Sequence, residues 1–312
     1  MSTQADTNKQ DIAKIESETA LPARTLLGDV WQQFRRHKLA MLASAILIFI
    51  VLSVALGGFI WTVDPTKPDI TNKNIFPSLN HPMGTDNLGR DLLAQMILGG
   101  RVSLMIGLVA MSIAMTLGTF VGAMSGFYKS LDNPLMRLTD LFISLPVLPL
   151  LLVIISLFRD SLRQVFGPEI GIFLLTVTVI GSLNWMATAR LVRGEVLSIK
   201  EREFVLAARS LGSSDFSILL RHVLPNVLSP VIVAATFSIA AAILTESALS
   251  FLGLGFPPDF PTWGRILFEG RSYMELYPYR VIFPGVAISL TVLCVNFIGD
   301  GLRDALDPRL RK

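Results

Sequence analysis

Long apolar segments separated by polar ones dominate this sequence of 312 residues. Six segments contain no charged residue over 18 to 27 consecutive positions. A helix needs about 20 apolar residues to cross a hydrocarbon layer about 30 Å thick, so each segment predicts one membrane-spanning helix. We therefore expect an all-α membrane protein with six transmembrane helices, over residues 39–63, 102–128, 141–158, 170–190, 223–247 and 281–299.

The composition excludes several kinds of protein and of functional site. It is 52% hydrophobic and only 16% charged, unlike a soluble protein. The three histidines are scattered, the single cysteine, Cys294, cannot form an internal disulfide, and no glycine precedes a lysine as a P-loop requires. We therefore expect no catalytic residues, no metal site and no cofactor bound by this chain. The net charge of +3 does not indicate a nucleic-acid partner in a membrane protein, and we expect none.

The distribution of lysine and arginine predicts the orientation. Six spans place both termini on the same side of the membrane, and that side carries 18 of the 27 lysines and arginines, against nine on the other side. Cytoplasmic segments of membrane proteins are enriched in these residues. Both termini are therefore predicted to be cytoplasmic.

The segments outside the spans differ in character. Residues 1–38 are predicted to be a cytoplasmic tail, with a disordered polar lead followed by an amphipathic helix over 25–38 that lies along the membrane surface. External loops are predicted at residues 64–101 and 248–280. Residues 300–312 are predicted to be a cytoplasmic tail.

Two patterns within the spans predict local geometry. Three glycines spaced four residues apart in the second span, Gly118, Gly122 and Gly126, favour the close approach of another helix. Pro146 and Pro149 interrupt the third span and predict a kink. Such a kink either lines a cavity or packs one helix against another.

The cytoplasmic loop over residues 193–226 is predicted to contain two helices joined by a tight turn. The serine and glutamate at 198 and 201 have capping-box spacing, which places a helix start near Ile199. Gly212 supplies the left-handed residue that ends this helix, and the next three residues offer caps to a second helix that runs toward Pro225. A short surface helix of this kind suits insertion into a groove of another protein. An amphipathic hairpin on lipid headgroups is the alternative.

The sequence of this loop resembles a known motif. LAARSLG at 206–212, followed by LLRHVLPN at 219–226, resembles the EAA coupling-loop motif of permease subunits of bacterial ATP-binding-cassette importers. Leu206 stands where the name of the motif has glutamate, whereas the alanines, the glycine and the proline match.

Three further stretches resemble the second of the two permease subunits in the dipeptide, oligopeptide and nickel branch of these importers. They are HPMGTDNLGRD at 81–91, ESALSFLGLG at 246–255 with the prolines and Trp263 that follow, and GDGLRDALDP at 299–308. The motifs stand in the expected order, and the resemblance covers about residues 25–312, with a permease core over 102–306.

The resemblance implies the fold of a type I importer permease in a bacterial inner membrane, and a defined set of partners. A second permease subunit would complete a heterodimer around the translocation path. Two ATPase subunits would bind ATP and Mg and hold the coupling loops, and an external solute-binding protein would deliver the substrate. The residues assigned to ATPase coupling are Glu203, Leu206, Ala207, Ala208, Leu211, Gly212 and Pro225.

Two external regions contain further candidate residues. The candidates for the pathway or the external gate are Glu246, Gly253, Gly255 and Trp263. For Glu246 the alternative is a structurally paired carboxylate. The candidates for docking of the solute-binding protein are Asp86, Arg90 and Asp91. Their alternative is a self-contained turn in which the arginine pairs with one of the aspartates.

These observations favour an importer permease for di- or oligopeptides, with nickel chelate or glutathione as alternative substrates in the same family. A self-sufficient secondary transporter is a second possibility. Such a transporter usually needs ion-relay carboxylates in the middle of its spans, and the six charge-free segments have none. A membrane-embedded enzyme would need paired carboxylates, an activated nucleophile or metal ligands at that depth, and these are also lacking.

Overall fold

The computed structural model describes residues 26–257 and 260–307, and no strand is found among them. Its elements are α2 (Leu26–Arg36), α3 (Lys38–Ile60), η1 (Ile70–Asn72), α4 (Leu92–Phe127), α5 (Lys129–Ser144), α6 (Val147–Phe166), α7 (Pro168–Ser182), α8 (Met186–Ile199), α9 (Glu203–Ser210), α10 (Asp215–Ile218), the π-helical η2 (Leu219–Val223), α11 (Leu224–Phe251), α12 (Trp263–Gly270), η3 (Arg271–Tyr273) and α13 (Tyr279–Leu306). The all-helical prediction is confirmed for this part of the chain. The predicted polar lead lies outside the described residues.

Four helical runs in the described part are long and apolar enough to cross a membrane, namely α3, α4, α10 to α11, and α13. Two bent pairs raise the number to six if each pair is one span: α5 with α6, bent by 86°, and α7 with α8, bent by 41°. The first bend comes at Leu145 and Pro146, because the residue before a proline disfavours helical geometry. The predicted third span, over 141–158, therefore contains a sharp bend.

Some helices extend past the charge-free segments. α4 begins at Leu92 because the carboxylate of Asp91 accepts a hydrogen bond from the backbone N–H of Ala94, at 2.8 Å. Arg101 does not end this helix. Its guanidinium donates to the backbone carbonyls of Val54 and Ala55 in α3, at 2.9 and 3.0 Å. The guanidinium of Arg101 thus has hydrogen-bond acceptors in α3, and α4 continues through this residue as a regular helix.

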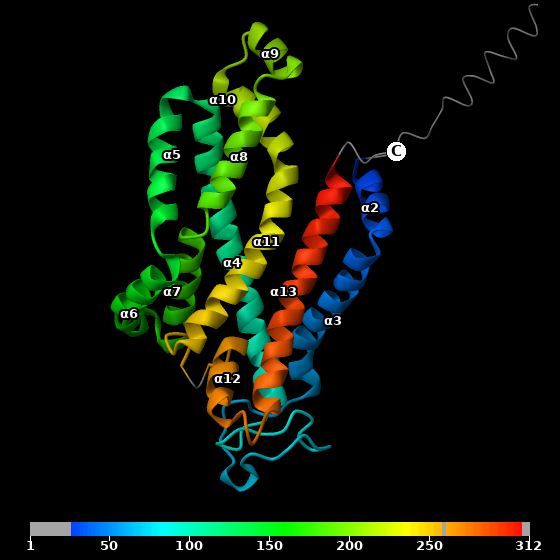
Figure 1. Cartoon of the computed structure of the whole chain (residues 1–312), viewed down its shortest axis with the longest axis vertical. Coiled ribbons are helices and arrows are strands. Elements are labelled where there is room, and N and C mark those ends of the chain that lie inside the picture. The colour runs from blue at the N-terminus through cyan, green and yellow to red at the C-terminus, as the bar shows by residue number, and fades with distance from the viewer. Residues whose placement is uncertain (1–25, 258–259, 308–312) are drawn as a thin grey trace, which may run out of the picture.

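α4 is the central helix and packs against α3, α7, α8, α11 and α12 (Figure 1). The predicted close approach at its three glycines is made by α8. A Cβ atom at Gly118 would lie 2.6 Å from Cβ of Thr188, and one at Gly126 would lie 2.8 Å from Cβ of Val196. Larger residues would push these two helices apart.

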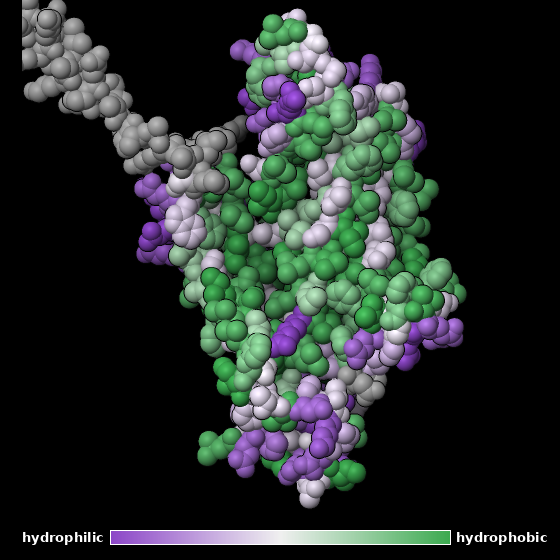
Figure 2. All heavy atoms as spheres, turned by 180° about the vertical axis from the view of Figure 1, so that it is seen from behind, coloured by the Kyte–Doolittle hydropathy of each residue, from purple (hydrophilic) through white to green (hydrophobic). Residues whose placement is uncertain are grey.

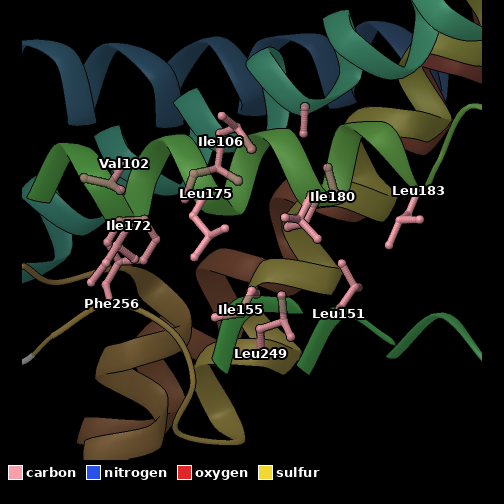
Figure 3. Close-up of a cluster of buried hydrophobic side chains, with 14 residues drawn as sticks. Val102, Ile106, Leu151, Ile155, Ile172, Leu175, Ile180, Leu183, Leu249 and Phe256 are labelled. Carbon is pink, nitrogen blue, oxygen red and sulfur yellow. The ribbon is translucent and has the colours of Figure 1, made fainter. Parts of the chain in front are cut away.

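A cluster of buried aliphatic side chains joins the bent pairs to the long helices (Figure 3). Ile106 of α4 lies beside Leu175 of α7, and Ile155 of α6 and Leu249 of α11 belong to the same cluster. On the face shown in Figure 2, the middle of the molecule is largely hydrophobic, and the hydrophilic residues concentrate toward its two ends. This distribution is the one expected when the sides of a helical protein face lipid.

The two ends of the molecule carry different elements. α9 and α10 lie at one end, together with α2 and the last turn of α13 (Figure 1). The segment between α3 and α4 lies at the opposite end with α12 (Figure 1). We call these the α9 end and the α12 end. The helix predicted over 25–38 is α2, and its Phe34 packs against Ala40 and Ala305.

Candidate functional site

The most prominent feature of the α9 end is a coupling element, which we define as residues 203–223. It protrudes beyond the ends of the long helices (Figure 1). Val205 and Ala208 on one face of α9 are buried, and they belong to the same core cluster as Ile218. The other face is exposed, and Leu211 at its tip is 86% exposed. The element therefore has one anchored face and one free apolar face, which suits insertion into a groove.

The predicted start of this helix is wrong. α8 continues through Ser198 to Ile199, and α9 begins only at Glu203, after an extended residue with no side-chain cap. The reason is tertiary packing: Val196 and Ile199 are buried in the cluster that α8 shares with α4, and the ammonium group of Lys200 donates to the carbonyl of Gly126 at 3.1 Å. The stabilisation from this packing exceeds the stabilisation that a capping box at the membrane surface would provide.

The predicted turn at Gly212 is confirmed. Its φ is +80°, and the backbone N–H of Ser213 donates to the carbonyl of Ala208 at 3.1 Å, which closes the helix. No atom lies within 4 Å of a Cβ built on Gly212. The glycine is therefore required by the left-handed backbone and not by lack of space. Ser214 caps α10 by accepting from the backbone N–H of Ser217, at 3.4 Å.

The second helix of the predicted pair does not stop at the membrane surface. α10, the π-helical η2 and α11 follow one another without an interruption. Pro225 lacks a backbone N–H, and the side-chain amide of Asn226 donates to the carbonyl of His222 at 2.6 Å. The coupling element is thus joined directly to a long apolar helix.

Six of the predicted coupling residues lie in α9 or in the turn that follows it, and the seventh, Pro225, lies in the first turn of α11. Ala208 is buried, whereas the exposed ones are Glu203, Leu206, Ala207, Leu211, Gly212 and Pro225. Phe204 and Phe216 are also exposed here, although they were not among the predicted coupling residues. The signal was available in the sequence, because both are aromatic residues within the two helices predicted for this loop. A cleft of about 840 Å³ between α8, α11 and α13 is lined by Phe204 but not by Phe216.

At the α12 end, the predicted gate residue Glu246 is a buried carboxylate, and Gly255 and Trp263 lie next to its hydrogen-bond partners. Glu246 of α11 is 1% exposed, and its Oε1 accepts from the hydroxyls of Ser250 and Thr262, at 2.7 and 2.8 Å. Its Oε2 has no hydrogen-bond partner among the described residues. Gly255 packs directly on Ser250. Glu246 is therefore held inside the chain, as in the structural alternative, and contact with a substrate stays a prediction.

Trp263 fixes α12 against α4. The indole is buried, its Nε1 donates to the carbonyl of Met96 at 3.0 Å, and the backbone N–H of Trp263 donates to Oγ of Ser103 at 3.2 Å. α11 ends at Phe251, and Gly253, two residues later, has a φ of +84° that turns the chain back toward α12. The segment after α11 thus folds back onto the bundle.

The three predicted docking residues are all buried in a turn. Arg90 donates from Nε to Asp86 at 2.6 Å and from a terminal nitrogen to Glu269 of α12 at 2.8 Å. Burial by itself lowers the pKa of Arg90, but the two carboxylates raise it above its ordinary value, so the guanidinium is charged. Asp91 accepts from Nε1 of Trp61 at 3.0 Å. Docking at this motif stays a prediction. In the structure, the three buried side chains stabilise the conformation of the loop.

Two anchors of this turn were missed because they come from distant segments. Glu269 binds Arg90 across 179 positions, and the hydroxyl of Tyr279 donates to the carbonyls of Ile75 and Thr85, both at 2.9 Å. No local sequence pattern predicts contacts between residues so far apart in the chain. Within residues 26–257 and 260–307, no three His, Cys, Asp or Glu side chains are grouped so that they could hold a metal ion.

Comparison with known proteins gives two family matches. Residues 114–312 match the binding-protein-dependent transport system inner membrane component, and residues 25–82 match the N-terminal TM domain of oligopeptide transport permease C.

Curated relatives extend over nearly the whole chain. The chain is 38% identical to the oligopeptide transport system permease protein OppC of Haemophilus influenzae, over 98% of this chain and 96% of the relative. It is 36% identical to the dipeptide transport system permease protein DppC of Bacillus subtilis, over 93% and 88%. It is 37% identical to the glutathione transport system permease protein GsiD of Escherichia coli, over 92% of both chains.

A solved structure shares the fold. A chain of the MetNI methionine ABC transporter superposes with a TM-score of 0.53 at 18% identity, and the match covers 67% of this chain and 95% of that chain.

Proposed function

Because this chain belongs to the family of binding-protein-dependent transport system inner membrane components, we propose that it is a permease subunit of an ATP-driven importer for di- or oligopeptides. The observation that carries the substrate class is the 36 to 38% identity to peptide permeases along nearly the whole chain. Glutathione is a second candidate, supported by the 37% identity to a glutathione permease. A nickel chelate is a third, supported only by the motif resemblance.

The coupling element is where we propose that ATP energy enters. The chain has no P-loop, so two partner ATPase subunits would bind ATP and Mg and would hold the exposed face of α9 in a groove. α10, η2 and α11 are continuous, so a displacement of α9 would move α11. The far end of α11 carries Glu246, which binds the cap of α12. One helix thereby connects the ATPase contact to the proposed external gate.

The remaining assignments concern orientation and assembly. The α9 end is cytoplasmic in this proposal, supported by the excess of lysine and arginine on that side. Both termini are then cytoplasmic, in an inner membrane. A second permease subunit completes the path, and a solute-binding protein delivers the substrate at the α12 end.

Transport by the reconstituted complex tests the proposal. The chain with its second permease and two ATPases in proteoliposomes, supplied with the binding protein, should take up labelled peptide only with ATP. Unlabelled peptides of graded length should compete, whereas a nickel chelate should not. Transport of a metal complex alone would refute the peptide assignment, and ATP-independent uptake driven by a proton gradient would refute the importer assignment.

A further inference from the structure

Three arginines lie where α6 meets α12 and the segment after α11. We call Arg159, Arg163 and Arg265 the arginine cluster. Arg159 and Arg163 are four positions apart in α6 and therefore lie on the same side of that helix. Arg163 and Arg265 both repel the charge of Arg159, so both lie near its guanidinium. The cluster therefore concentrates positive charge at one place.

The chain itself satisfies the guanidinium of Arg159 only in part. One terminal nitrogen donates to the carbonyl of Gly255 at 3.2 Å, whereas the buried Nε has no hydrogen-bond partner in the described part of the chain. A partly buried donor without an acceptor is destabilising. An acceptor supplied by a ligand would remove this cost.

The charge of the cluster is also incompletely balanced. Arg265 pairs with Glu269 at 2.9 Å. Among the described carboxylates, none forms an ion pair with Arg159 or Arg163, although Asp160 offsets part of the repulsion. Two guanidinium groups of one helix face thus remain available to an anion.

We propose that Arg159 and Arg163 bind the C-terminal carboxylate of the incoming peptide, an inference that rests on the proposed function and adds which part of the substrate is recognised. A guanidinium binds a carboxylate through two parallel charge-assisted hydrogen bonds. Every di- or oligopeptide with a free C-terminus carries this group, whatever its side chains. The contact therefore suits peptides of different sequence.

The site is open to a solute. Arg159 and Arg163 are both partly exposed. Arg163 lines a cleft of about 410 Å³ together with Asp160, Gln164 and Pro168. This volume lies in the range of small-molecule sites, so the last residue of a peptide can enter it.

Arg159 faces the bundle and not the lipid. It follows Ile155 by four positions, and Ile155 is 1% exposed, so the two side chains lie on the same side of α6. Leu157, which is 68% exposed, lies on nearly the opposite side. The segment that Arg159 binds is held against α6, because Phe256 is buried in the same cluster as Ile155. This position favours a solute at the proposed gate over a lipid headgroup.

The first test compares uptake of a peptide and of its C-terminal amide by the reconstituted complex. The pair is chosen so that the purified binding protein binds both equally, and both are supplied at saturation. The wild type should transport the free acid about tenfold faster, as expected for a hydrogen-bonded charge pair. Arg159→Gln should abolish this preference and leave the rate for the amide unchanged. Arg159→Lys keeps the charge and should retain part of the preference.

A matched control separates recognition from damage to the fold. Arg271 is an exposed arginine that stacks on Phe268 outside the cluster, so Arg271→Gln should keep the preference. An equal loss of rate for both peptides in Arg159→Gln would overturn the proposal, as would a wild type without preference. A loss seen only in vesicles that contain phosphatidylglycerol, with the preference unchanged, would assign the arginines to a lipid headgroup and would also overturn it.

The second test locates the carboxyl end of the substrate without the amide. A labelled peptide that ends in benzoylphenylalanine with a free carboxylate is photocrosslinked during transport by the full complex. Crosslinks to residues 159–166 or 254–257 support the proposal, and crosslinks confined to other parts of the complex overturn it. A wild-type complex that takes up no peptide would instead refute the proposed function.

Discussion

Gly212 shows how much depends on single backbone positions. Its φ of +80° lies in the left-handed region, and the turn that it makes sets the direction of α9 relative to α10. Arg209 and Asp215 face each other across this turn at 3.6 Å, but both are more than half exposed. An exposed pair of this kind contributes little, so the backbone conformation of the glycine determines the geometry.

Replacement of Gly212 by valine should therefore uncouple transport. A non-glycine residue in the left-handed region costs about 1–2 kcal/mol, and a β-branched side chain is the least tolerant of it. A loss of this size lowers the population of the correct turn about 5- to 30-fold, and ATP-dependent uptake should fall to a similar extent. Gly212→Asn is the matched control, because asparagine tolerates this conformation and should keep most of the uptake. Wild-type uptake in the valine variant would contradict the role of the turn.

At the scale of elements, α12 is held from two sides. Its N-terminal cap, Thr262, accepts from the backbone N–H of Arg265 at 3.1 Å and donates to the buried Glu246 at 2.8 Å. Its Glu269, near the C-terminal end, accepts from Arg90 of the outer loop. α12 therefore links the long helix α11 to the external loop, and its attachment should control the gate.

Thr262→Val should loosen this attachment. The change removes a helix cap, which costs about 1 kcal/mol, and leaves Glu246 with one donor fewer. ATP hydrolysis in the absence of binding protein should rise severalfold, and the amount of peptide carried per ATP should fall. Steady-state ATPase and uptake assays on the same proteoliposomes measure both. Thr262→Ser keeps the hydroxyl and should behave as wild type, so identical behaviour of the two variants would count against a role for the Thr262 hydroxyl in holding α12.

At the scale of the whole molecule, the two ends are chemically different although both are polar. The α9 end carries a protruding helix with a free apolar face, whereas the α12 end carries a loop that is tied to α12 and α13 by buried polar groups. In the proposed orientation these ends face opposite compartments. That orientation makes a direct prediction about chemical access.

Single cysteines at Leu211 and Leu79 should label from opposite sides. Both positions are exposed, and the native Cys294 is buried, so it contributes little background. In intact cells whose outer membrane has been made permeable, a membrane-impermeant maleimide should modify Leu79→Cys and spare Leu211→Cys. Inverted membrane vesicles should give the reverse. Labelling of both positions from one side would rule out the predicted topology.

The amino-acid sequence alone determined the features that depend on neighbouring residues. The apolar segments mark the helices that need lipid or protein around them, Pro146 marks the bend between α5 and α6, and Gly212 marks the turn of the coupling element. Each follows from a local property: hydrophobicity over one helix length, a missing N–H, or an allowed left-handed backbone.

Tertiary structure decided everything that depends on residues distant in sequence. Packing of α8 against α4 overrode the capping box at 198–201 and moved the start of α9. The partner of Arg90 on α12 lies 179 positions away, and the docking candidates proved to be buried while apolar side chains around them are exposed. The physical reason is that burial and pairing are properties of the assembled bundle, and a local sequence pattern carries no record of which helix will lie alongside it.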